Sequence, residues 1–219
     1  FDEEFVIQRL TTAKYLTSDK YFIAMLALRG KYDKIADKLK ELYVKAVAES
    51  YKNMVIPGLQ LNKVILVLDV SASMHSSYPK IMGMISPFAP LVKDIILFSN
   101  NYYHEDPRKL YSVDQMMHML KHAPWGGTNV RSALLEARRF ASEDDVIMIV
   151  TDEQENVDIN KQITTPHIVI NPKPYPSHMP FDTQYIFVPA TNAESLASAY
   201  RLTQIFRLNP TKNFKISNP

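Results

Sequence analysis

A hydrophobic run in the first half of the chain ends in oxygen-bearing side chains at alternate positions. The run Val64–Leu68 contains only Val, Ile and Leu, and it is followed by Asp69, Ser71 and Ser73. In extended backbone, side chains two residues apart point the same way, so these three groups can face one point. A carboxylate and two hydroxyls at one point suit a hard divalent cation.

Two later segments carry oxygen ligands of the same kind. Thr128 lies in Gly-Gly-Thr-Asn, a turn before an expected helix, and Asp152 ends the apolar run Val146–Asp152. In open α/β sheets, ligands bind outside the carboxyl ends of the strands, where such loops converge. The predicted ligands of one divalent ion, directly or through water, are Asp69, Ser71, Ser73, Thr128 and Asp152.

The chemistry of this ligand set indicates both the ion and its use. Few carboxylates and several neutral hydroxyls favour Mg²⁺, or another divalent cation such as Mn²⁺ or Ca²⁺. Neutral ligands leave the ion electrophilic, so that it can accept a carboxylate from a ligand or a partner protein. We therefore expect recognition of an acidic group.

Some of these residues also have a purely local interpretation. Asp69, Ser71 or Ser73 can cap the helix that follows, as serine and aspartate commonly do. Such capping explains neither Thr128 nor Asp152, and we favour the metal site.

The histidines suggest no other chemistry from their spacing. His75 lies close to Ser73, but no carboxylate is placed to orient it as a base, and we interpret it as a solvated loop side chain. His118 and His122 are four residues apart on an expected helix, but no third metal ligand is evident.

After Pro57 the chain alternates between expected strands and helices. Short, wholly apolar strands separated by helices predict an α/β protein with a mainly parallel sheet flanked by helices on both faces. The expected strands are Val64–Leu68, Asp94–Ser99, Tyr102–His104, Val146–Asp152, His167–Ile170 and Tyr185–Val188. The expected helices are Lys80–Leu91, Val113–Ala123, Val130–Ser142 and Glu194–Leu208.

Residues 1–56 read as helix, and we predict a helical arm there and a single domain over residues 57–219. One helix is expected over Asp19–Gly30, with Ser18 or Asp19 as its N-cap and Gly30 at its C-terminal end. A second covers Tyr32–Met54, where lysines alternate with acidic residues at spacings that favour ion pairs within the helix.

Composition narrows the class of protein only slightly. The 219 residues include no cysteine and carry a formal net charge of +2, so a disulfide scaffold is excluded and charge alone does not indicate nucleic-acid binding. The first residue is Phe1 and not Met, so we expect a fragment or a processed product. No apolar run approaches the roughly 20 residues that cross a bilayer, and we expect no membrane partner.

The order Asp69-Val70-Ser71-Ala72-Ser73, then Thr128, then Asp152 resembles the metal-ion-dependent adhesion site (MIDAS) of von Willebrand factor A domains, over about residues 60–208. Within that family, LDVSASM, GGTNV and VTDEQEN are most similar to the A domain of Ro-type (TROVE-module) ribonucleoproteins. The resemblance implies a doubly wound, mainly parallel sheet flanked by helices, of von Willebrand A or Rossmann-like type, which agrees with the alternation of strands and helices. It also implies a cytoplasmic Ro-like ribonucleoprotein whose helical ring binds small non-coding RNA. This chain lacks nearly all of such a ring.

We expect no enzymatic activity, because the patterns of three enzyme classes are missing. Ser71 stands where a haloacid-type phosphotransferase needs a second aspartate, Gly-x-Ser-x-Gly is absent, and no glycine-rich phosphate loop follows the first strand. The expected function is metal-dependent capture of an acidic group. The alternative is direct binding of small non-coding RNA by this chain through its basic helices.

Overall fold

The computed structural model describes residues 2–12, 16–123, 126–152, 166–173, 185–189 and 192–208. Its α-helices are α1 (Glu3–Thr12), α2 (Ser18–Leu28), α3 (Asp33–Met54), α4 (Tyr78–Ile85), α5 (Val113–Lys121), α6 (Val130–Phe140) and α7 (Ala193–Leu208). Its strands are β1 (Val64–Asp69), β2 (Val92–Phe98), β3 (Tyr102–Glu105), β4 (Val146–Val150), β5 (Ile168–Asn171) and β6 (Ile186–Pro189). Three short 3₁₀ helices are η1 (Ala72–Ser77), η2 (Ser86–Phe88) and η3 (Pro107–Tyr111).

The strands form one six-stranded sheet in the order β3-β2-β1-β4-β5-β6. Every neighbouring pair is parallel except β2 and the edge strand β3, which are antiparallel. The chain leaves β1 towards β2 and later crosses to β4 on the other side. The order of strands therefore reverses at the carboxyl end of β1, which is where ligands bind in sheets of this type.

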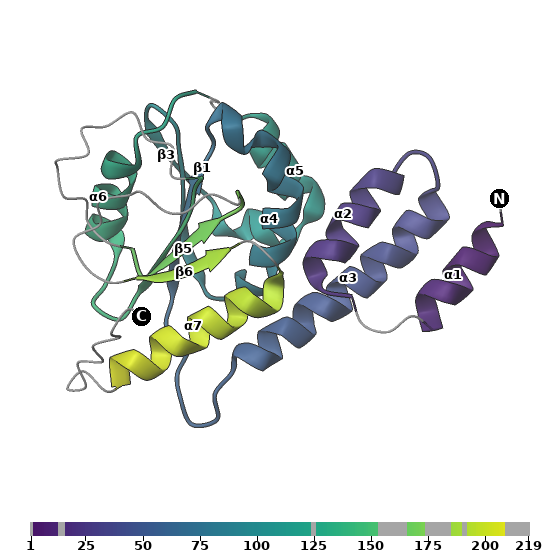
Figure 1. Ribbon diagram of the computed structural model, residues 1–219, viewed down its shortest axis with the longest axis horizontal. Coiled ribbons are helices and arrows are strands. Elements are labelled where there is room, and N and C mark those ends of the chain that lie inside the picture. The colour runs from purple at the N-terminus through teal and green to yellow at the C-terminus, as the bar shows by residue number, and fades with distance from the viewer. Residues whose placement is uncertain are drawn as a thin grey trace, which may run out of the picture.

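Helices cover both faces of the sheet (Figure 1). Along β1, Val64, Leu66 and Leu68 belong to a core shared with α4, α5 and α7, whereas Ile65 and Val67 belong to a second core under α6. Successive strand residues point to opposite faces, so a strand covered on both sides is apolar at every position. The predicted α/β class and the mainly parallel, helix-flanked sheet are confirmed.

The N-terminal helical arm is also present, and its helices α2 and α3 pack against α4 and α7 (Figure 1). Phe22 of α2 and Leu39 and Tyr43 of α3 belong to the same hydrophobic core as Leu66 of β1. Gly83 allows α2 and α4 to pack closely. A Cβ atom on this residue of α4 would lie 2.4 Å from the Asp19 Cα atom of α2.

Several element ends differ from the predictions for physical reasons. The N-cap of α2 is Thr17, not Ser18 or Asp19. The Ser18 hydroxyl instead donates to the Gly83 carbonyl, and the Asp19 carboxylate accepts a hydrogen bond from the Ala193 N–H of α7. Gly30 does adopt the left-handed φ of +75° expected at the end of this helix.

The expected helix Lys80–Leu91 is shorter and divided. It begins at Tyr78 and ends at Ile85, and η2 continues it over Ser86–Phe88, with Pro87 inside the 3₁₀ turn. Proline cannot donate a backbone hydrogen bond, which favours the break. No helix of the described ranges is long and apolar enough to cross a membrane.

Candidate metal centre

Asp69 is the last residue of β1 and is fully buried. Its Oδ1 atom accepts a hydrogen bond of 2.8 Å from the Ser71 N–H, and its Oδ2 atom accepts one of 2.7 Å from the Thr151 hydroxyl. These two bonds fix the plane of the carboxylate between the loops that follow β1 and β4. An ionised carboxylate has about four acceptor positions, so each oxygen keeps capacity for a further partner.

The two serines of the first loop meet as the alternate spacing predicts. The Oγ atoms of Ser71 and Ser73 lie 3.1 Å apart, with Ser71 3% exposed and Ser73 exposed to solvent. Ser71 is extended, with φ −69° and ψ 158°, and it is the N-cap of η1 without a side-chain capping bond. The capping interpretation therefore does not describe the Ser71 hydroxyl.

The glycine-rich turn lies beside this loop. Gly126 forms a parallel β-bridge with Ser71, and the Ala72 N–H donates to the Gly126 carbonyl. Three residues later, the Asn129 N–H donates to the Ser99 carbonyl at the end of β2 with a length of 2.8 Å. Thr128 is half-buried between these two anchors, so its backbone is held next to the Asp69 loop.

The two glycines lie close to the Asn100 side chain in the turn between β2 and β3. A Cβ atom on Gly127 would lie 2.4 Å from Asn100 Oδ1, and one on Gly126 would lie 3.2 Å from Asn100 Nδ2. A larger residue at Gly127 would have to displace the exposed Asn100 side chain. The preceding residue, Trp125, lies outside the described residues.

Asp152 is two residues beyond the end of β4 and is only 3% exposed. Its negative charge reaches Asp69. Burial is the main cause that raises the pKa of Asp69 to about 6, the charge of Asp152 adds to the rise, and the hydrogen bonds from Ser71 and Thr151 oppose it. The charge of the buried Asp152 thus disfavours ionisation of the buried Asp69.

The structure brings Asp69, Ser71, Ser73 and Asp152 to the carboxyl edge of the sheet, with the Thr128 backbone anchored beside them. The sequence interpretation missed two supporting residues. Thr151 holds Asp69 Oδ2, and the hydroxyl of fully buried Tyr78 donates to the Asp69 carbonyl. Thr151 had a signal, since it directly precedes the predicted ligand Asp152 just after β4, the strand beside β1. Tyr78 had none.

Among the described residues, no group of three or more His, Cys, Asp or Glu side chains could hold a metal ion. The candidate centre has only two such residues and otherwise hydroxyls, so it differs from sites rich in histidine or carboxylate. His75 is exposed, as expected from the sequence, but it lies in the 3₁₀ helix η1 and not in a loop.

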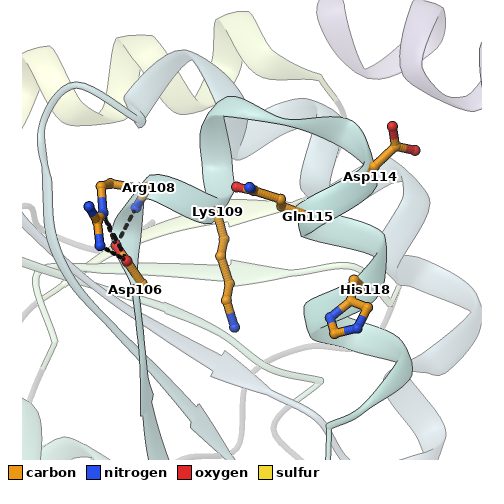
Figure 2. Close-up of a pocket in the computed structure, with 6 residues that line it drawn as sticks. All are labelled: Asp106, Arg108, Lys109, Asp114, Gln115 and His118. Carbon is orange, nitrogen blue, oxygen red and sulfur yellow. Dashed lines mark hydrogen bonds and ion pairs between the residues drawn. The ribbon is translucent and has the colours of Figure 1, made fainter.

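A cavity of about 560 Å³ lies on other elements, between η3 and α5 (Figure 2). Its charged walls are largely neutralised by their own pairs. Asp106 accepts a hydrogen bond of 2.8 Å from Arg108 Nε, and Asp114 pairs with Arg29 of α2. The cavity therefore shows no strong preference for an anion or a cation, and none of the five predicted ligands lines it.

Comparison with protein-family models gives no match for this chain, and comparison with curated proteins gives none either.

Proposed function

We propose that this chain is a recognition domain of von Willebrand A type that holds a divalent ion, Mg²⁺ or a related cation, at the carboxyl ends of β1 and β4. The ligands, directly or through water, are Asp69, Ser71, Ser73, Thr128 and Asp152. When bound, the ion supplies a Lewis acid that accepts a carboxylate oxygen from a partner protein or another ligand. No catalytic step is proposed.

The observation that carries the proposal is the pair of buried carboxylates. Asp69 is fully buried, Asp152 is 3% exposed, and the pKa of Asp69 is raised to about 6 by burial and by the charge of Asp152. The two hydrogen bonds that Asp69 accepts come from neutral groups. Burying ionised carboxylates together costs free energy unless a positive charge compensates them, and a divalent cation does so.

The surrounding residues support the same use of the site. Thr151 and the Ser71 N–H orient Asp69, and the exposed Ser73 hydroxyl, 3.1 Å from Ser71, leaves the loop open to solvent on one side. An ion held there would keep a position accessible to an incoming acidic group. Hard oxygen donors with few carboxylates match the preference of Mg²⁺.

We further propose that the domain belongs to a Ro-like RNA-binding ribonucleoprotein, on the motifs described above. Direct RNA binding by the basic helices of this chain has less support. The Glu41 carboxylate of α3 forms ion pairs with Lys45 Nζ at 2.6 Å and Lys38 Nζ at 2.7 Å. Part of the positive charge of this helix is therefore compensated within it.

Titration calorimetry with Mg²⁺ tests the metal site. Asp69→Asn keeps the shape of the side chain and removes its charge, and we expect it to lower the Mg²⁺ affinity at least about tenfold, in the range of lost charge-assisted contacts. Asp106→Asn makes the same change at the half-buried N-cap residue of η3, and as the matched control it retains wild-type affinity. Wild-type affinity in Asp69→Asn, with the protein folded, contradicts the proposed ligand set.

A second experiment tests the function itself. A surface carrying immobilised carboxylate peptides retains the wild-type chain in Mg²⁺ and releases it when a chelator is added. Binding to small structured RNA that resists the chelator and falls steeply with salt favours the RNA-binding alternative instead.

A further inference from the structure

Two histidine side chains stack on the exposed surface of α5, and neither is among the predicted ligands. His118 and His122 are one helical turn apart, both are exposed, and their ring centroids lie 4.1 Å apart with planes inclined by 31°. Side chains at positions i and i+4 of a helix lie on the same face. The two imidazoles therefore meet side by side at the C-terminal end of the helix.

A hydrogen bond fixes the state of one ring. The Nδ1 atom of His122 lies 2.9 Å from the His118 carbonyl oxygen. A carbonyl can only accept, so Nδ1 must carry the hydrogen, and in the neutral ring Nε2 then has the lone pair. An imidazole whose other nitrogen donates to a backbone carbonyl is the usual form of a histidine metal ligand.

Neither the ring separation nor the position on the helix opposes a cation. Metal–nitrogen bonds of about 2.0–2.1 Å place two imidazole nitrogens of one ion about 3 Å apart. With ring centroids 4.1 Å apart, the two side chains are within reach of one ion once the rings turn so that a nitrogen of each faces it. His118 lies in the last turn of α5 and His122 is its C-cap residue. The negative end of the helix dipole lies there and favours positive charge.

We propose that His118 and His122 form a binding site for a divalent transition ion with nitrogen preference, such as Zn²⁺, Cu²⁺ or Ni²⁺. No third His, Cys, Asp or Glu of the described chain completes the site. Asp114, one turn before His118, pairs with Arg29. The remaining positions of the ion take water or an external ligand, and His118 also lines the cavity between η3 and α5 (Figure 2).

Zn²⁺ titration of the whole chain at neutral pH tests this site. His118→Gln and His122→Gln each remove one ligand, and each lowers the Zn²⁺ affinity at least about tenfold, because the second contact of a chelate is intramolecular. His75→Gln removes an exposed histidine of η1 and is the matched control with wild-type affinity. Unchanged affinity in either α5 variant overturns the proposal.

The Cu²⁺ electron paramagnetic resonance spectrum gives an independent readout. The wild type shows coupling to two imidazole nitrogens, and each single α5 variant shows coupling to one; an identical spectrum in all three proteins overturns the proposal. The site does not depend on the proposed function. Asp69→Asn keeps the Zn²⁺ affinity even if it loses Mg²⁺, and the α5 variants keep Mg²⁺ binding.

Discussion

At the residue scale, the candidate centre depends on how one carboxylate is held. Asp69 accepts one hydrogen bond from the Ser71 N–H and another from the Thr151 hydroxyl, just after β4. A hydrogen bond to a buried charged group contributes more than one between neutral groups, about 1.5–3 kcal/mol against roughly 1 kcal/mol. Thr151 thus stabilises the loop geometry as well as orienting a ligand.

Thr151→Val removes this hydroxyl and nearly preserves the side-chain shape. We expect the free energy of unfolding to fall by about 1.5–3 kcal/mol, because a buried carboxylate oxygen loses a donor. Urea unfolding followed by circular dichroism measures the change. Thr151→Ser keeps the hydroxyl and serves as the control; equal losses in both variants would mean that packing, not the hydrogen bond, is responsible.

The part of the candidate site that depends on the spacing of residues within one segment could be predicted from the sequence. Asp69, Ser71 and Ser73 alternate in one segment, and Asp152 follows an apolar run that ends at the same sheet edge as Asp69. The hydrogen bond from Tyr78 to the Asp69 carbonyl could not be predicted, since it depends on how η1 folds back over β1. The role of Asn100 beside the glycines depends on the packing of a third loop.

Among the helices, the close packing of α2 on α4 depends on the absence of a side chain at Gly83. Gly83 in α4 allows α2 to approach so closely that an added Cβ atom would lie 2.4 Å from the Asp19 Cα atom and 3.0 Å from the Phe22 Cβ atom. The obstacle at Asp19 is backbone, which cannot rotate away as a long side chain can.

Gly83→Ala separates two opposite effects. Helix propensity alone favours alanine by about 1 kcal/mol. We expect the clash to dominate and to lower the free energy of unfolding by about 1–3 kcal/mol, as overpacking does in cores. Chemical unfolding of the variant measures the sign, and a gain in stability contradicts the close packing of α2 on α4.

A polar cluster ties α6 to the edge of the sheet. His104 of β3 lies with Nδ1 2.7 Å from Asp94 and Nε2 3.3 Å from Glu136 of α6, and Arg139 donates to Glu136 at 3.0 Å. Burial alone would raise the pKa of Glu136, but the hydrogen bonds from His104 and Tyr102 and the charge of Arg139 outweigh it and lower that pKa. Because α6 begins two residues after Thr128, this cluster also supports the candidate centre.

The lowered pKa of Glu136 predicts how the stability of the protein changes with pH. A carboxyl group with a lower pKa in the folded state contributes stability that is complete above its unfolded pKa, near 4.5, and is lost as the pH falls through the folded value. The stability difference between the wild type and Glu136→Gln should therefore shrink between about pH 5 and pH 3. Urea midpoints over this range measure it, and a constant or growing difference contradicts the assignment.

The elements themselves were largely predictable because the strands are continuous apolar runs. β1, β2, β4 and β5 are mostly buried, and such runs are typical of parallel strands covered on both faces. Their ends were less predictable. Ser18 and Asp19 are residue types that commonly cap helices. Here their side chains form hydrogen bonds with the backbone of other elements instead, at Gly83 and Ala193.

At the scale of the whole molecule, the arm and the sheet share a core. Phe22 is fully buried, its ring lies 5.4 Å from that of Tyr43 in α3, and it borders Gly83 in α4. The helical pattern of residues 1–56 distinguishes them from the rest of the sequence. Such a pattern does not show which helix faces pack against the sheet domain, so the shared core could not be predicted. The shared core implies that the arm and the sheet unfold together.

Phe22→Ala tests this coupling. We expect a single cooperative transition whose free energy falls by about 3–5 kcal/mol, the cost of a large cavity in a core. Ile23→Ala changes the adjacent residue, which is 40% exposed, and should stay within about 0.5 kcal/mol of the wild type. Two separate transitions, with only one shifted by Phe22→Ala, would show that the arm unfolds on its own.

The sheet order places the candidate centre where strand order reverses, at the carboxyl end of β1. Loops after β1 and β4 and the turn before α6 meet there, although they are far apart in sequence. We propose that one divalent ion binds where these three segments meet.

Crystals grown or soaked with Mn²⁺, measured at a wavelength where manganese scatters anomalously, test this claim most directly. We expect an anomalous density peak among the oxygen atoms of Asp69, Ser71, Ser73, Thr128 and Asp152. A map with no peak at that edge of the sheet, while the same five side chains are well defined, would contradict it.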